Sequence, residues 1–127
     1  MDSVHIENKM KESPYIEQIM VIGANRKFVS ALIVPSFVQL RAWLKDKGAD
    51  IMDGNDAGLI QLPEVRTLIE EQVAKYNAFL GHVEQVKKFT LLPKEWTIDT
   101  AELTPSLKIK RKVIEKKFES QIEGMYA

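Results

Sequence analysis

The chain has no cysteine, no net charge and no long apolar segment, and each absence removes a class of function. Without cysteine there are no disulfides, thiolate metal sites or cysteine nucleophiles, and the composition fits a cytoplasmic, reducing compartment. The 18 Lys and Arg residues balance 18 Asp and Glu residues, whereas non-specific nucleic-acid binders normally carry a basic excess. No apolar run approaches the ~18 residues of a membrane helix, so we expect no transmembrane segment. Any cationic function must be local.

The residues that are present suffice for one domain with one moderate core, because the chain has 127 residues of which 45% are hydrophobic. Runs rich in β-branched residues predict strands over 16–23, 28–34 and 86–92, and the first two form a hairpin candidate in which Gly23 and Asn25 could take positive φ. Apolar spacing and capping residues predict four helices: one ending before Pro14, one over 36–48, one over 63–81, and a last one carrying Val113, Ile114, Phe118 and Ile122.

These elements predict an α+β fold, with a small, mainly antiparallel three-stranded sheet covered by helices. Ser36 is the expected N-cap of the second helix and Gly48 its C′ residue. Residues 50–61 are expected to form a polar surface loop. No glycine-rich phosphate-binding motif occurs.

The usual catalytic side chains give weak signals in this sequence. His5 and His82 have no partner at the spacing of a triad or a metal site. Asp53 and Asp56 resemble a calcium loop only in part, since the other ligand positions are missing, so no metal site is predicted. Trp43 and Trp96 could stack a base, but a single aromatic residue on a helix or after a strand is more typical of the core.

The segment from Lys108 to Lys117 has the strongest local charge, with six basic residues against Glu115 alone. It could be a solvated helix face supported by an Arg111–Glu115 pair at i, i+4. It could bind nucleic acid, although interleaved aromatic residues are missing. In a third interpretation Lys108, carried by a polar loop ahead of a basic helix, is a mobile cation that meets a phosphate or carboxylate. Composition does not choose among the three.

Four segments together resemble a known family. They are 6–23, 28–35, the stretch Glu102-Leu-Thr-Pro-Ser-Leu-Lys-Ile-Lys-Arg, and 122–126. In this order they resemble the C-terminal domain of AMP-forming long-chain acyl-CoA synthetases, in the adenylate-forming superfamily. The resemblance implies that 1–127 is one lid domain, that Met1 was added to an excised piece, and that the hinge and the N-terminal domain for ATP and fatty acid are absent. It implies a parent ligase that converts a fatty acid and ATP to acyl-AMP and then forms acyl-CoA.

The resemblance also assigns roles to residues. Lys108 matches the catalytic lysine of adenylation, on a loop formed by Thr104, Pro105 and Ser106. Leu107 stands where the broader superfamily commonly has glycine, as in the long-chain branch. By position and not by motif, coenzyme A phosphates could be bound by Arg26, Lys27, Lys110 and Arg111.

The expected partner is the N-terminal adenylation domain of the same polypeptide, with fatty acid, ATP, Mg²⁺ and coenzyme A as substrates or cofactor of the full enzyme. The domain alone is expected to fold, to bind no cofactor and to be inactive. Two alternatives stay open: a free-standing interaction module, and a small nucleic-acid-binding domain that uses residues 108–117. Acyl chain length, oligomeric state and peripheral membrane association of the full enzyme have no signal in this sequence.

Overall fold

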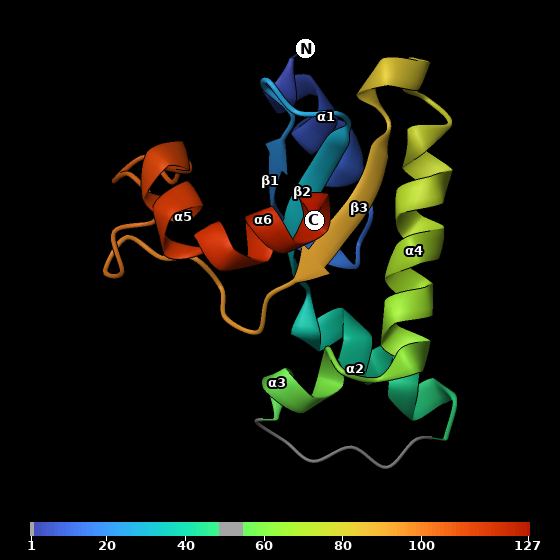
Figure 1. Cartoon of the computed structure of the whole chain (residues 1–127). Coiled ribbons are helices and arrows are strands. Elements are labelled where there is room, and N and C mark those ends of the chain that lie inside the picture. The colour runs from blue at the N-terminus through green and yellow to red at the C-terminus, as the bar shows by residue number, and fades with distance from the viewer. Residues whose placement is uncertain (1, 49–54) are drawn as a thin grey trace.

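A three-stranded sheet lies between two layers of helix in the computed structural model, which describes residues 2–48 and 55–127 (Figure 1). The elements in chain order are α1 (Ser3–Met10), β1 (Ile16–Ile22), β2 (Val29–Pro35), α2 (Phe37–Asp46), α3 (Asp56–Leu59), α4 (Pro63–Asn77), a 3₁₀ turn η1 (His82–Glu84), β3 (Val86–Leu91), α5 (Arg111–Lys117) and α6 (Glu119–Tyr126). The predicted α+β class and the three predicted strands are confirmed.

The sheet has the order β1-β2-β3, so β2 is the central strand. All seven residues of β2 are buried, which explains its nearly continuous apolar sequence. β1 runs antiparallel to β2, as the hairpin pattern predicts, with Ile19 opposite Ile33. β3 runs parallel to β2, with Phe89 beside Ala31. The sheet is therefore mixed, because the chain returns to β3 through α2, α3 and α4, a crossover long enough for parallel pairing.

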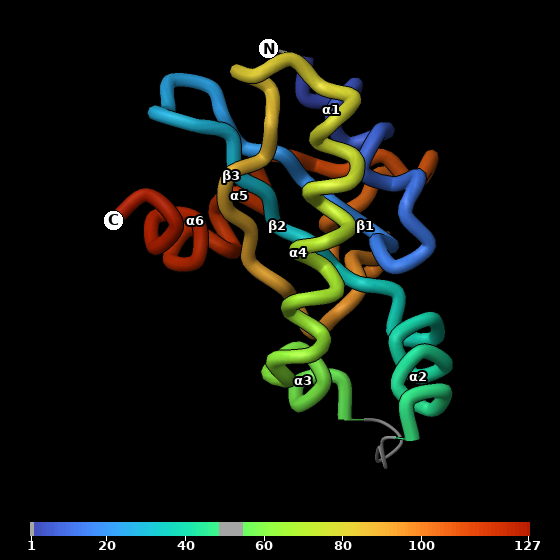
Figure 2. The backbone as a smooth tube through the Cα atoms, turned by 90° about the vertical axis from the view of Figure 1, so that its right-hand side faces the viewer, coloured from blue at the N-terminus to red at the C-terminus, as the bar shows by residue number. Residues whose placement is uncertain are grey.

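Alternate residues of the strands supply two separate cores, so the expectation of a single core is wrong: helices cover both faces of the sheet. On one face, side chains such as Ile19 and Ile33 pack with buried residues of α1, α2 and α4, among them Ile6 and Leu40. On the other face, Met20 and Leu32 pack with Trp96 and with buried residues of α5 and α6. Figures 1 and 2 show the result from two directions: α4 lies on one side of the sheet and α6 on the other.

Several local predictions hold. The Ser36 side chain accepts a hydrogen bond from the Gln39 backbone N at 3.4 Å and caps α2, and Gly48 has φ of 77° just after that helix. Asn25 takes φ of 60° in the turn between β1 and β2, whereas Gly23 does not take positive φ. Trp96 is buried, as predicted for a core residue, and Trp43 is partly buried against the first core.

Other local predictions are wrong. Asp56 was expected in a surface loop over 50–61, but it begins α3 and lies 2.7 Å from Arg41 Nη2; Asp53 lies outside the described residues. The helix expected over 63–81 ends at Asn77, which leaves Phe79 exposed. The last helix is broken at Phe118 into α5 and α6. Within residues 2–48 and 55–127, no helix has both the length and the hydropathy to cross a bilayer.

Candidate functional site

Residues 103–109 form a small hairpin, and Lys108 lies near its C-terminal end. Leu103 and Ile109 pair as an isolated antiparallel bridge. Between them, Thr104 N donates to Lys108 O at 2.8 Å, and Leu107 N donates to Thr104 O at 2.8 Å. Lys108 N also donates to Thr104 Oγ1 at 3.1 Å. The loop predicted around Thr104, Pro105 and Ser106 is thus held by its own hydrogen bonds, and it presents Lys108 exposed to solvent.

Leu107 has φ of 64°, in the left-handed region. A turn closed by a bond from residue i+3 to residue i, followed by a left-handed residue, is the usual form of a three-residue hairpin loop. Glycine takes this conformation without steric cost, whereas a Cβ atom adds about 1–2 kcal/mol. The geometry therefore explains why glycine suits the position before the lysine. Here an exposed leucine stands in its place.

Leu107→Gly should raise the free energy of unfolding of the chain by up to about 1 kcal/mol. Relief of the left-handed leucine outweighs the added entropy of an unfolded glycine, about 0.4–1 kcal/mol, and a side chain that is 67% exposed loses little packing. Urea denaturation measures the change. Leu107→Ala is the matched control, because alanine keeps the Cβ atom and hence the strain; an equal gain in both variants would contradict this explanation.

Glu102 holds the base of this hairpin. The residue is buried, and its side chain accepts hydrogen bonds from Lys117 Nζ at 2.9 Å, from Thr97 N at 3.4 Å and from the Thr100 hydroxyl. Its carbonyl oxygen accepts from Lys110 N at 2.8 Å. One residue thus ties the hairpin to the preceding turn and to the C-terminal end of α5.

Arg111 begins α5 and pairs with Glu7 of α1, not with Glu115. Its Nη1 and Nη2 lie 2.8 and 2.6 Å from Glu7 Oε2 and Oε1. The Arg111–Glu115 pair predicted from i, i+4 spacing is therefore wrong. The expectation that Arg111 is available for a phosphate is weakened, because both terminal nitrogens are already bound to a carboxylate.

Arg26, in the turn between β1 and β2, is also paired with a carboxylate. Its guanidinium contacts both carboxyl oxygens of Glu123 in α6, with Nη1 3.1 Å from Oε2, and lies over the Tyr126 ring. The hydrogen bond raises the pKa of Arg26 and lowers the pKa of Glu123. Lys27 in the same turn is exposed, and so is Lys110.

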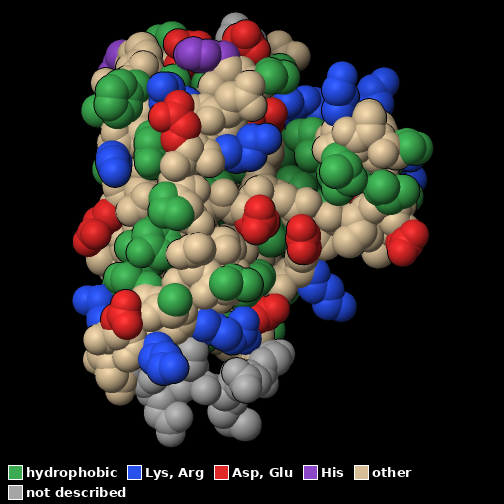
Figure 3. All heavy atoms as spheres, turned by 180° about the vertical axis from the view of Figure 1, so that it is seen from behind, with side chains coloured by type: hydrophobic (Ala, Val, Ile, Leu, Met, Phe, Trp, Pro, Cys, Tyr) green, Lys and Arg blue, Asp and Glu red, His purple; other side chains and the backbone are tan. Residues whose placement is uncertain are grey.

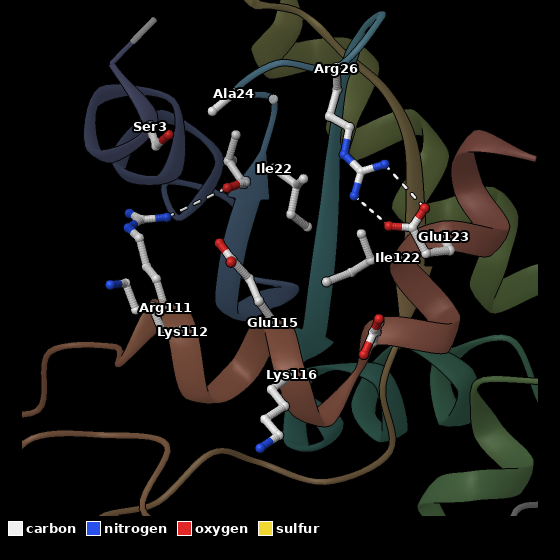
Figure 4. Close-up of a pocket in the computed structure, with 13 residues that line it drawn as sticks. Ser3, Ile22, Ala24, Arg26, Arg111, Lys112, Glu115, Lys116, Ile122 and Glu123 are labelled. Carbon is white, nitrogen blue, oxygen red and sulfur yellow. Dashed lines mark hydrogen bonds and ion pairs between the residues drawn. The ribbon is translucent and has the colours of Figure 1, made fainter.

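A groove of about 590 Å³ runs between the turn after β1, the start of α1, and the helices α5 and α6 (Figure 4). Arg26 and Arg111 line it, together with Lys112, Glu115 and Lys116. Lys27, Lys108 and Lys110 are not among its lining residues. The structure therefore brings together two of the predicted binding residues and places Lys108 on a separate hairpin.

Sequence reasoning missed the carboxylates that hold these arginines. Glu7 is 104 residues from Arg111, and Glu123 is 97 residues from Arg26, so no local pattern links either pair. The sequence offered one signal for Glu7: it follows Ile6 directly and precedes Met10 by three residues. Both of these apolar residues are fully buried in α1.

Among residues 2–48 and 55–127, the remaining candidates form no centre. Both histidines are exposed, and Figure 3 shows histidine side chains on the surface among charges of both signs. In the part of the chain that the structure describes, no group of three His, Asp or Glu side chains is placed to hold a metal ion.

The chain is similar to one protein family model over its whole length and to part of several long-chain-fatty-acid–CoA ligases. The model of the AMP-binding enzyme C-terminal domain matches residues 1–127. A long-chain-fatty-acid–CoA ligase of Mycobacterium tuberculosis is 34% identical over 121 residues, which is 95% of this chain and 20% of that protein. Human long-chain-fatty-acid–CoA ligase 1 is 32% identical over 125 residues, 96% of this chain and 18% of that protein. The chain thus spans about a fifth of the length of these relatives.

Solved structures agree on the fold. The adenylation-carrier didomain of carboxylic acid reductase from Segniliparus rugosus, solved with AMP, superposes with a TM-score of 0.76 at 19% identity, over 99% of this chain and 16% of that one. The adenylation domain of the carboxylate reductase from Mycobacterium chelonae gives the same score and identity, with 18% of that chain covered. Because the family model matches the whole chain, the chain belongs to the family of AMP-binding enzyme C-terminal domains.

Proposed function

We propose that residues 1–127 are the C-terminal lid domain of a long-chain fatty-acid–CoA ligase and that they supply Lys108 to the adenylation step. The main support is the match of the whole chain to the family and to ligases of that name. The exposed position of Lys108 on its hairpin gives further support to this proposal. Among the described residues this side chain makes no ion pair, unlike Arg26, Arg111 and Lys117, so its charge is available to a substrate.

In the first half-reaction, a carboxylate oxygen of the fatty acid attacks the α-phosphorus of ATP, and pyrophosphate leaves with the electrons of the broken P–O bond. Both reactants are anionic and repel each other as they approach. The Lys108 ammonium, with three donors and a full charge, would stabilise the charge that develops on the phosphoryl oxygens. Mg²⁺ would arrive with ATP on the adenylation domain.

In the second half-reaction, the thiol sulfur of coenzyme A attacks the acyl carbon, AMP leaves and the thiol proton is released. Lys108 has no charge-bridging task here, because the acyl-adenylate is already formed. Arg26, Lys27, Lys110 and Arg111 are the candidates for coenzyme A phosphates. For Arg26 and Arg111, a phosphate would have to displace a carboxylate or share the guanidinium with it.

The nucleic-acid alternative loses support from the structure. Of the six basic residues from Lys108 to Lys117, Arg111 and Lys117 are paired with the buried carboxylates of Glu7 and Glu102. A nucleic-acid phosphate would have to displace these carboxylates or share the two side chains with them, which leaves fewer free charges for phosphate contacts than the sequence suggests.

The proposed function is tested by deletion. We expect the coding sequence that contains this chain to encode an ATP-binding adenylation domain upstream, and the full ligase to release pyrophosphate with a long-chain fatty acid. A version that lacks residues 1–127 should lose at least about 10²-fold in that rate, because the developing charge has no ammonium. The proposal fails if no such domain is encoded, or if the deletion leaves pyrophosphate release unchanged.

A further inference from the structure

Two buried carboxylates hold α5, one at each end. At the N-terminal end, Arg111 pairs with Glu7, whose side chain has 7% relative exposure. At the C-terminal end, Lys117 pairs with Glu102, whose side chain has 4%. The basic residues at the two ends of α5, Arg111 and Lys117, therefore fix this helix to the rest of the domain.

Glu7 is the more informative of the two, because one carboxylate connects three elements. It belongs to α1, it accepts the Val21 backbone N–H of β1 at 2.7 Å, and it binds both terminal nitrogens of Arg111. Arg111 Nη1 also lies 3.5 Å from the Val21 carbonyl oxygen. The planar guanidinium of Arg111, with two nitrogens bound like a fork to a carboxylate that is itself hydrogen-bonded, has little freedom to move.

Arg111 is joined to Lys108 by a short and stiff path. Lys110, its neighbour, donates its backbone N–H to Glu102 O at 2.8 Å, next to the Leu103–Ile109 bridge that closes the hairpin. Displacement of the start of α5 would therefore be transmitted to the hairpin and to Lys108. The cost of misplacing a reacting group by about 1 Å reaches roughly 10²-fold in rate.

We propose that Glu7 is a positioning residue for adenylation: through Arg111 it fixes the place at which the domain presents Lys108. The inference rests on the proposed function of Lys108. It is distinct from a purely structural role, because Glu7 would matter more for the step that uses Lys108 than for the step that does not.

The test measures both half-reactions in the full ligase, at a temperature where circular dichroism shows each variant folded. Glu7→Gln places an amide N–H₂ against Arg111 and should loosen the fork. We expect pyrophosphate release to fall roughly 10- to 10²-fold in kcat with little change in the KM for ATP, while thioester formation from supplied acyl-adenylate is nearly unchanged.

Two further variants sharpen the result. Arg111→Lys keeps the charge and loses the fork, so it should lower the same half-reaction. If Glu7→Gln does not fold, this variant decides the question by the same criterion, with thioester formation measured at saturating coenzyme A, because Arg111 is also a candidate for the phosphates of coenzyme A. Asp56→Asn is the matched control, an acid-to-amide change in the Arg41 pair on α2 and α3, and it should leave both half-reactions unchanged.

Lys108→Ala, measured in parallel, separates the two proposals. If it leaves pyrophosphate release unchanged, the proposed function fails. If it abolishes that release but Glu7→Gln and Arg111→Lys do not lower it, the positioning role of Glu7 is overturned. Equal losses in both half-reactions for the Glu7 and Arg111 variants would also overturn it, since they would indicate a general structural effect.

Discussion

Trp96→Ala should lower the free energy of unfolding of the chain by about 3–5 kcal/mol. Trp96 is 1% exposed and is the largest fully buried side chain of the described residues. It belongs to the second core, which also contains Met20 and Leu32 of the sheet and Ile114 of α5. Its Nε1 has no hydrogen-bond partner, so the expected loss comes from apolar burial and from the cavity left behind.

Urea denaturation of the chain followed by circular dichroism measures this loss. The matched control is Trp43→Ala, the same truncation at a partly buried site on α2, where Lys47 Nζ lies 4.8 Å from the ring centroid. This variant should lose clearly less. Equal losses would contradict the conclusion that the second core depends on Trp96. Because that core carries α5, the result also bears on how firmly the Lys108 hairpin is supported.

Lys108→Ala should lower the rate of acyl-adenylate formation in the full ligase by about 10²–10³-fold or more. The change removes the ammonium that would lie between two approaching anions, and the exposed side chain carries no hydrogen bond or ion pair among the described residues whose loss could unfold the domain. Pyrophosphate release in a single turnover measures the effect. The melting temperature should stay close to that of the unmodified enzyme.

Lys112→Ala is the control for charge alone. Lys112 is an exposed lysine in the first turn of α5, four residues from Lys108, and it is not part of the hairpin. If a general basic surface attracts the substrate, both variants should slow adenylation similarly. If one positioned cation acts in the transition state, only Lys108→Ala should.

Much of the fold could be predicted from the sequence, because the strands and most helices depend on local signals. Runs of β-branched residues predicted all three strands, and Ser36 and Gly48 predicted where α2 begins and ends. The direction of β3 could not be predicted in this way. It depends on where the chain lies after α4, and that follows from packing of the whole helical crossover and not from residues 86–91.

The candidate site was predicted in part. Pro105 and its polar neighbours predict the loop that carries Lys108, and the structure adds the hydrogen bonds that make this loop a hairpin. The partner of Arg111 could not be predicted, because helix spacing favours Glu115 and the carboxylate that binds it belongs to α1. Ion pairs between residues about a hundred positions apart are set by the tertiary fold alone.

The central claim is that Lys108 serves one half-reaction and not the other. The most direct measurement compares, in the full ligase and in Lys108→Ala, the single-turnover rate of pyrophosphate release with the rate of acyl-CoA formation from supplied acyl-adenylate. The account predicts a loss of about 10²–10³-fold or more in the first rate and little change in the second. Equal losses in both rates, or no loss in the first, would contradict it.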